Sequence, residues 1–255
     1  MFKLSPFKLG VFRQCRRRYK YHYVDGLYGQ YHKRWPHLTM GAHVHGALNA
    51  FFSRLNRDRS PARLRWLLQQ RWGRYRDCFA DRAEEQLYWS RALGQLRWLC
   101  ATQDLTAQPI MLEAIHEVGL APGFRLVGKV DRVDRDEDGA LCIVDYKTNK
   151  SSGYADDFQL LAYALLLGRK FRAEVASASY LFLNGDGLHN LVPTSADLER
   201  AAELLHAARA EIQAERNYEP RPGPLCRWCD FQDLCAEARL DDLEYDLTDD
   251  AFEEP

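Results

Sequence analysis

The spacing of apolar residues divides the chain into a helical first part and a second part in which strands and helices alternate. Between residues 40 and 103 apolar side chains recur every three or four positions, the period of an amphipathic helix. The segment Asn56–Pro61 interrupts this pattern and predicts a break. Ser5-Pro6 is typical of a helix N-cap followed by proline, and it predicts a helix that runs through Cys15 to about Tyr23.

After residue 108 the pattern changes to short runs rich in β-branched and aromatic residues, which predict strands. The expected strands are Ile110–Val118, Phe124–Asp134, Leu141–Thr148 and Val175–Asn184, and helices are expected at about Phe158–Leu167 and Ser195–Ala214. The sequence DEDG at residues 136–139 is a turn signal, so the second and third strands should form an antiparallel hairpin. The order of elements predicts an α/β protein.

The composition indicates a globular protein whose charges are unevenly distributed along the chain. The apolar share of 46% is ordinary for a globular protein. No signal peptide and no run of 18 apolar residues is visible, so we expect a cytoplasmic protein. Residues 1–100 hold 20 Lys and Arg against 6 Asp and Glu, whereas residues 101–255 hold 15 against 30. This asymmetry indicates either that the first part faces a polyanion or that Arg-rich helices solvate themselves.

The most unusual stretch is CIVDYKTN, residues 142–149, because a strand suited to a buried sheet carries two charges. Residues two apart in a strand share a face, so Asp145 and Lys147 point together and Tyr146 points away. Hairpin pairing can bring Asp131 near Asp145, and two adjacent carboxylates repel unless a cation such as Mg²⁺ or Mn²⁺ neutralises them. Lys147 could then orient a water or stabilise a phosphate. The alternative is a surface salt bridge between Lys147 and either aspartate.

Three motifs in sequence resemble the RecB-like branch of the PD-(D/E)XK nuclease superfamily: Gly128-x-x-Asp131, Asp145-Tyr146-Lys147 and Gln159-x-x-x-Tyr163. Upstream, Gly41-x-x-x-His45-x-x-Leu48 is similar to the helical histidine motif of that branch. An acidic residue usually precedes the hairpin, and Glu113 falls there, although Glu117 competes for the assignment. The resemblance covers most of the chain, from Ser5 to Cys235.

This resemblance implies a restriction-endonuclease-like mixed sheet flanked by helices, with a large helical insertion. It implies that the metal ligands are His45, Asp131, Asp145 and the Tyr146 carbonyl, that Lys147 is catalytic, and that Gln159 and Tyr163 support the site and contact DNA. Taken alone, His45 on an apolar helix face would be a packed core histidine. Taken alone, Gln159 and Tyr163, one helical turn apart, would be a polar helix face packed on the sheet.

The cysteines predict a second site. Three of the seven follow the spacing Cys226-x2-Cys229-x5-Cys235, and Cys15 on the first helix is the candidate fourth. The iron–sulfur subgroup of the superfamily has this same split pattern, so the resemblance implies a 4Fe–4S cluster that clasps the two ends of the chain. Spacing alone leaves zinc on the same four sulfurs as the alternative. The other three are expected to be buried thiols without a role; they are Cys78, Cys100 and Cys142.

A basic and aromatic run lies on the first helix and offers phosphate-binding charges and stacking rings for unpaired bases. The run comprises Arg13, Arg16, Arg17, Arg18 and Lys20 with Tyr19, Tyr21 and Tyr23. It favours single-stranded or frayed DNA as the substrate, and the alternative is a solvated helix beside the cluster. The final 15 residues contain eight acids and no base, which predicts a disordered tail that could also bind a partner or shield the basic face.

The resemblance leads to a division of the chain and to three functional hypotheses. The division is residues 1–39 with the first cysteine, 40–108 with the histidine motif, 109–220 as nuclease core, 221–239 with the cysteine segment, and 240–255 as acidic tail. The preferred function is a metal-dependent DNA exonuclease similar to RecB-family exonucleases and to the nuclease of CRISPR adaptation, acting in repair, recombination or CRISPR adaptation. The second is a catalytically weak DNA-binding module that serves a helicase or integrase. The third is a zinc-stabilised helical DNA-binding protein whose acidic hairpin is only surface.

Overall fold

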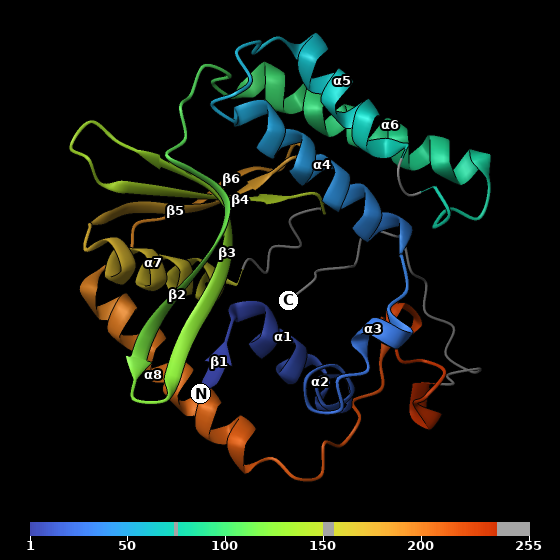
Figure 1. The fold of residues 1–255 in the computed structure, drawn as a ribbon, viewed down its shortest axis with the longest axis vertical. Helices are drawn as coiled ribbons and strands as arrows, with labels where there is room; N and C mark the ends of the chain where they lie inside the picture. Colours follow the sequence, from blue (N-terminus) through green and yellow to red (C-terminus); the bar gives the residue numbers. More distant parts are fainter. Residues whose placement is uncertain (74–75, 150–155, 239–255) are drawn as a thin grey trace.

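The fold is a mixed β-sheet with helices on both faces (Figure 1). The computed structural model describes residues 1–73, 76–149 and 156–238. The strands are β1 (Phe2–Leu4), β2 (Met111–Ala121), β3 (Phe124–Arg135), β4 (Leu141–Lys147), β5 (Val175–Phe182) and β6 (Gly187–Leu191). The helices are α1 (Pro6–Gln14), α2 (Arg16–Tyr19), α3 (Tyr28–Tyr31), α4 (Pro36–Phe52), α5 (Pro61–Trp72), α6 (Arg82–Thr102), α7 (Asp157–Phe171) and α8 (Ser195–Ala214). This arrangement confirms the predicted mixed sheet flanked by helices.

The alternation of side chains along the central strands builds one apolar core on each face of the sheet. Ile143 on β4 belongs to the cluster with α1, α7 and α8, whereas its neighbours on the strand face the other way. Tyr146 and Leu181 pack in a second cluster with α4, α5 and α6. The helical region of residues 40–108 therefore packs directly on the sheet (Figure 1).

The pairing of β3 opens a gap at the position where the charged motif lies. The start of β3 pairs in parallel with β1 as far as Leu126, and its end pairs antiparallel with β4 from Arg132 onward. The ladder between β3 and β4 ends at the pair Arg132↔Val144, so the two strands diverge beyond it. β4 continues in parallel with β5 as far as Lys147. The divergence places an opening beside Asp131 that α4 and α7 can reach from opposite faces.

Most of the expected elements are confirmed. Ser5 caps α1, since its side chain accepts a hydrogen bond from the Lys8 N–H at 3.0 Å. The helical region contains α4, α5 and α6, with the first break between α4 and α5 as expected. β3 and β4 form the hairpin, and Gly139 in its turn has a φ of 85°. The short strands β1 and β6 were not expected, because three to five residues carry too little periodicity to be recognised.

The prediction of one continuous helix to Tyr23 is wrong. α1 ends at Gln14, Cys15 is extended with φ −157° and ψ 114°, and α2 then begins, followed by a π-helical turn over Lys20–Val24. Helix propensity alone gives no reason for this break. Tertiary structure does, because the extended backbone at Cys15 places its thiol in a cavity shared with the C-terminal cysteines.

Two further points concern the acidic tail and membrane-spanning segments. The acidic tail, residues 240–255, lies outside them. None of the helices that are described is both long and apolar enough to cross a membrane.

Gly128 permits the close packing of α7 on β3. A Cβ at this position would lie 2.8 Å from Leu166 Cδ2 and 2.9 Å from Tyr163 Cε1. We therefore expect Gly128→Ala to lower the free energy of unfolding by about 1–3 kcal/mol, because α7 must move outward. Urea unfolding measures the loss. Gly119→Ala on β2 is the matched control, since a Cβ there meets nothing within 4 Å and should change stability by less than about 0.5 kcal/mol. Equal losses in the two variants would contradict this account.

Candidate active site

Side chains from α4, β2, β3 and β4 converge at the divergence of β3 and β4. His45 Nδ1 lies 3.2 Å from Asp131 Oδ1. Ligand atoms of His45, Glu113 and Asp131 all lie within 4.8 Å of one another, and all three residues are partly buried. Lys147 Nζ lies 3.1 Å from Asp145 Oδ2. The predicted residues of the charged motif and of the histidine motif are thus brought to one place.

Asp131 is fixed by the same divergence that creates the opening. Beyond Val144 the backbone of β4 leaves the β3 ladder, and the Tyr146 N–H donates to Asp131 Oδ2 at 2.9 Å instead. Burial raises the pKa of Asp131, but the charge and hydrogen bond of His45, the Tyr146 N–H and the charge of Lys147 outweigh it, so the pKa is lowered overall. Asp131 is therefore held ionised, with its Oδ1 toward His45.

Asp145 is the most deeply buried carboxylate of the group, with 6% of its surface exposed. Burial raises its pKa and the charge of Asp131 raises it further, while Lys147 and His45 act in the opposite direction. The net pKa of Asp145 is raised. Without the Lys147 ammonium this carboxylate would be a buried charge with a like charge beside it, which is strongly unfavourable. The pair Asp145–Lys147 is therefore one electrostatic unit.

Glu113 is the third acid of the site. The register of β2 on β3 sets it opposite Asp131, between the pairs Leu112↔Arg132 and Ala114↔Val130. Its φ is 44°, a conformation that non-glycine residues rarely adopt and that often marks functional positions. Asn49 Nδ2, one turn after His45 on α4, donates to Glu113 Oε2 at 3.0 Å, and Lys129 Nζ lies 3.4 Å from the same oxygen.

The competition between the two glutamates of β2 is resolved in favour of Glu113. Glu117 pairs with Lys3 Nζ at 2.7 Å and with Arg125 Nε at 3.1 Å, away from the site. The ligand set implied by the resemblance contained Asp145 and the Tyr146 carbonyl but not Glu113. In the structure the group of potential ligands is His45, Glu113 and Asp131, while Asp145 contacts Lys147.

The acidic neighbours of His45 raise its pKa. Burial lowers its pKa, but the charge and hydrogen bond of Asp131, with the charges of Asp145 and Glu113, outweigh burial and raise it. A histidine packed only in an apolar core would show the opposite shift. The side chain of His43, two residues earlier, lies in the helical layer instead, with 4% of its surface exposed and its ring 5.3 Å from that of Trp72.

Gln159 and Tyr163 on α7 hold Lys147 from the other face of the sheet. Lys147 Nζ donates to Gln159 Oε1 at 3.1 Å, and Gln159 Nε2 donates to the Tyr163 hydroxyl at 3.0 Å. Tyr180 on β5 also reaches Gln159 Oε1, at 3.0 Å from its hydroxyl. The sequence motifs assign no role to Tyr180 or Asn49. The only signal for Asn49 is its spacing of four from His45.

Two close contacts hold the helical layer against the end of β4, one from α4 and one from α6. A Cβ on Gly41 would lie 3.1 Å from Thr148 Oγ1, so glycine lets α4 approach the end of the catalytic strand. Buried Gln95 on α6 donates to the Thr148 carbonyl at 2.6 Å. The helical layer therefore positions both the histidine and the strand that carries Lys147.

The donor set fits a divalent cation. One imidazole nitrogen and two carboxylates at mutual distances below 4.8 Å match the ligands of Mg²⁺ or Mn²⁺ better than those of a soft metal. The hydrogen bond from Asn49 and the ion pair with Lys129 both use Oε2 of Glu113.

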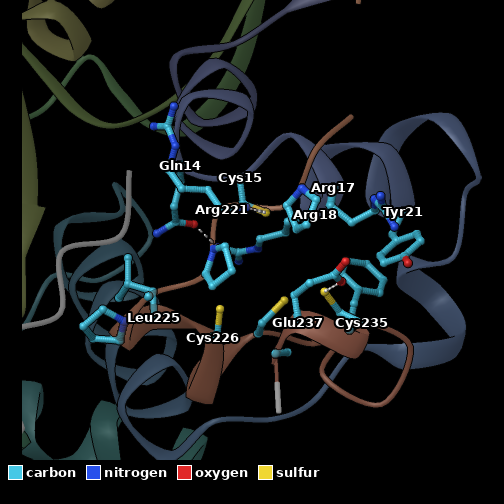
Figure 2. A pocket seen from close by; sticks show the side chains of 17 residues that line it. Gln14, Cys15, Arg17, Arg18, Tyr21, Arg221, Leu225, Cys226, Cys235 and Glu237 are labelled. Atoms are coloured by element: carbon cyan, nitrogen blue, oxygen red, sulfur yellow. Dashed lines mark hydrogen bonds between the residues drawn. The ribbon is translucent and has the colours of Figure 1, made fainter. Parts of the chain in front are cut away.

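The four predicted cysteines line a single cavity of about 190 Å³ between the N-terminal helices and the C-terminal segment (Figure 2). Figure 2 shows the sulfur atoms of Cys15 and Cys226 directed into it from opposite walls. Burial raises the pKa of the thiols of Cys229 and Cys235, and Arg18 opposes the shift at Cys229. Arg17 and Arg18 also line the cavity and supply positive charge beside the sulfurs.

Side chains between the cysteines anchor the C-terminal segment. Phe231 is fully buried, with its ring 5.5 Å from that of Tyr21. Buried Asp230 accepts a hydrogen bond from the Lys33 N–H at 2.8 Å. Trp228 packs edge-on against Trp35, just before α4, at 5.1 Å. The cysteine segment is thus fixed to the region from which the histidine helix starts.

The basic and aromatic run has a different environment from the one predicted. Arg16 pairs with Glu211 at 2.6 Å and with Glu215 at 2.7 Å, and Arg17 donates to the Tyr218 carbonyl at 2.9 Å. Tyr19 is buried, with 2% of its surface exposed. These side chains hold the first helices to the end of α8, so the expected role in contacting DNA gains no support from their positions.

The remaining cysteines lie outside both sites. Cys78, Cys100 and Cys142 are partly buried and do not line the cysteine cavity. Burial raises the pKa of the thiols of Cys78 and Cys100. A raised pKa keeps a thiol protonated and therefore unreactive, as expected for cysteines without a role.

Comparison with known proteins identifies the family. A protein from Eubacterium rectale described as a putative exonuclease shares the fold at a TM-score of 0.56 and 12% identity, over 96% of this chain and 90% of that chain. The crystal structure of SSO0001 aligns over 92% of this chain and 85% of that chain, at 15% identity and a TM-score of 0.44. No curated protein matches the sequence. A family model described as the PD-(D/E)XK nuclease superfamily matches residues 3–236, so this chain belongs to the PD-(D/E)XK nuclease superfamily.

Proposed function

We propose that this protein is a metal-dependent DNA nuclease, an exonuclease that acts on single-stranded or frayed ends. The observation that carries the proposal is the convergence of His45, Glu113 and Asp131 on one point, beside buried Asp145 and its partner Lys147. Surface acids without a function have no need of a strained backbone or of a buried carboxylate paired with an ammonium.

In this proposal the residues divide into metal ligands and groups that act on the phosphate and water. His45, Glu113 and Asp131 would hold a divalent cation, and Asp145 and the Tyr146 carbonyl are the further ligands that the family motif implies. The bound cation supplies a polarised phosphate and a more acidic water. Lys147, held by Asp145 and Gln159, orients the attacking water and stabilises charge that develops on the phosphate. Tyr163 keeps the Gln159 amide in place.

DNA is the proposed substrate because the superfamily consists of nucleases and because the Lys and Arg surplus lies in the first 100 residues. Exonucleolytic action is in line with the description of the Eubacterium rectale protein. Such an activity would serve repair, recombination or CRISPR adaptation, with a helicase or an integrase as partner. The catalytically weak DNA-binding module is the competing function, and cleavage assays separate the two.

The four cysteines are proposed to hold a 4Fe–4S cluster. The proposal is supported by the split spacing of the cysteines, which resembles that of the iron–sulfur subgroup, and by the cavity that all four of them line. Zinc on the same four sulfurs is the alternative. The cluster would clasp α1 to the C-terminal segment.

Lys147→Ala tests the nuclease directly. We expect it to lower the rate of Mn²⁺-dependent cleavage of an end-labelled single strand by about 100-fold or more, because charge on the phosphate loses its ammonium. Gel analysis after anaerobic purification measures the rate. Lys170→Ala, an exposed change on α7, should cleave like wild type. Equal cleavage by wild type and Lys147→Ala, or none by either, would favour the binding module.

The ligand set can be tested by comparing the two glutamates of β2. Glu113→Gln should weaken Mn²⁺ binding by at least about tenfold, because a neutral amide replaces one of two charged ligands. Isothermal titration measures the affinity. Glu117→Gln is the matched control on the same strand and should bind Mn²⁺ like wild type. If both variants bind equally, Glu113 is not a ligand.

If the four cysteines hold an iron–sulfur cluster, the purified protein should have a characteristic colour and elemental composition. Anaerobically purified wild type should be brown and contain iron and acid-labile sulfide, and Cys229→Ser should lose both, because one of four ligands is gone. Cys142→Ser, at a cysteine outside the cavity, should keep the wild-type spectrum. A colourless wild type with stoichiometric zinc would overturn the cluster and assign the site to zinc.

A further inference from the structure

Tyr180 occupies a position at the centre of the lysine site that the sequence motifs do not include. It lies on β5, where the parallel register places it directly opposite Asp145. Only 2% of its surface is exposed. Neighbouring residues of parallel strands in register share a face, so the Tyr180 ring lies on the same side of the sheet as Asp145 and Lys147.

The ring of Tyr180 contacts the Lys147 ammonium. Lys147 Nζ lies 4.6 Å from the ring centroid, within the range of a cation–π interaction. Two aromatic rings also lie near it: that of His189 on β6, at 6.2 Å between centroids and 21° between planes, and that of Phe182 on β5, at 6.2 Å and 61°. The phenol therefore forms a fixed wall of the space in which the ammonium lies.

The hydroxyl of Tyr180 sets the orientation of the Gln159 amide. It lies 3.0 Å from Gln159 Oε1 and 2.9 Å from the Asp156 carbonyl, and its single proton can serve either acceptor. Lys147 Nζ donates to the same Gln159 Oε1. Because the amide oxygen accepts from Lys147, and also from Tyr180 when the phenol donates to it, the amide NH₂ faces Tyr163. Burial, with the charges of Asp145 and Asp156, raises the pKa of Tyr180, so the phenol stays protonated and remains a donor.

We propose that Tyr180 is a positioning residue that fixes Lys147 for the reaction, through its ring and through the Gln159 amide. The inference rests on the proposed nuclease function. In this proposal Tyr180 acts through Lys147 and Gln159, and not on the phosphate or the cation directly. Three directional contacts restrain the ammonium: Asp145 at 3.1 Å, Gln159 at 3.1 Å and the Tyr180 ring at 4.6 Å. Without them, a lysine on a flexible stem loses its preorganised position.

The kinetic test separates the hydroxyl from the ring. Under saturating Mn²⁺, Tyr180→Phe should lower kcat by about tenfold, the value of one hydrogen bond of about 1.4 kcal/mol, with KM and Mn²⁺ affinity unchanged. Tyr180→Leu also removes the cation–π contact and should lose a further factor of about five. The double variant Tyr180→Phe with Gln159→Ala should match Gln159→Ala alone, because the hydroxyl acts through that amide. Tyr88→Phe, a buried tyrosine of the helical layer, is the control for losing a hydroxyl.

The position of Lys147 can also be read without activity. With ¹³C-lysine labelling, assigned through Lys147→Arg, the Lys147 Cε protons should show an upfield ring-current shift in wild type and Tyr180→Phe that disappears in Tyr180→Leu. Absence of that shift in wild type overturns the inference whether or not the protein cleaves DNA. Wild-type kcat in Tyr180→Phe overturns it too, as do losses that simply add in the double variant or follow thermal stability. A wild type that shows the shift but never cleaves refutes only the nuclease function.

Discussion

The ion pair between buried Asp145 and partly buried Lys147 is the constraint on which the rest of the site depends. A carboxylate with 6% exposure beside a second acid is tolerated only if positive charge and hydrogen-bond donors surround it. The surroundings meet this need with Lys147, whose ammonium is in turn held by Gln159 and covered by the Tyr180 ring. The raised pKa of His45 and the lowered pKa of Asp131 show that the remaining charges compensate one another in the same way.

Two features of the backbone make these charges meet. The β3–β4 ladder ends at Arg132↔Val144, so Asp131 takes the Tyr146 N–H that an extended ladder would have used. The opening can be reached from both faces of the sheet, by α4 with His45 and by α7 with Gln159. The helical layer is therefore part of the site. Its residue Gln95 donates a hydrogen bond to the Thr148 carbonyl, directly after the strand that carries Lys147.

The sequence predicted what depends on local period, and missed what depends on pairing between distant segments. Asp145 and Lys147 share a face because the strand period is two, and DEDG sets the hairpin that joins β3 to β4. The choice between Glu113 and Glu117 depends on the register of β2 on β3, which puts the first opposite Asp131 and the second opposite Val127. Tyr180 is one apolar strand position among several until the parallel pairing sets it beside Asp145. The helix break at Cys15 depends on a cavity whose other cysteines lie more than 200 residues further along the chain.

Helix α4 connects the candidate active site with the cysteine segment. Its first turn contacts the cysteine segment, since Trp228 packs against Trp35 and lies 4.9 Å from the ring of His37. His45 follows eight residues after His37, about 12 Å along the helix axis at 1.5 Å per residue. A helix is stiff over that length, so a displacement at its start is carried to the imidazole. The contacts of Asp230 and Phe231 that hold the cysteine segment against the N-terminal helices thus also restrict where His45 can lie.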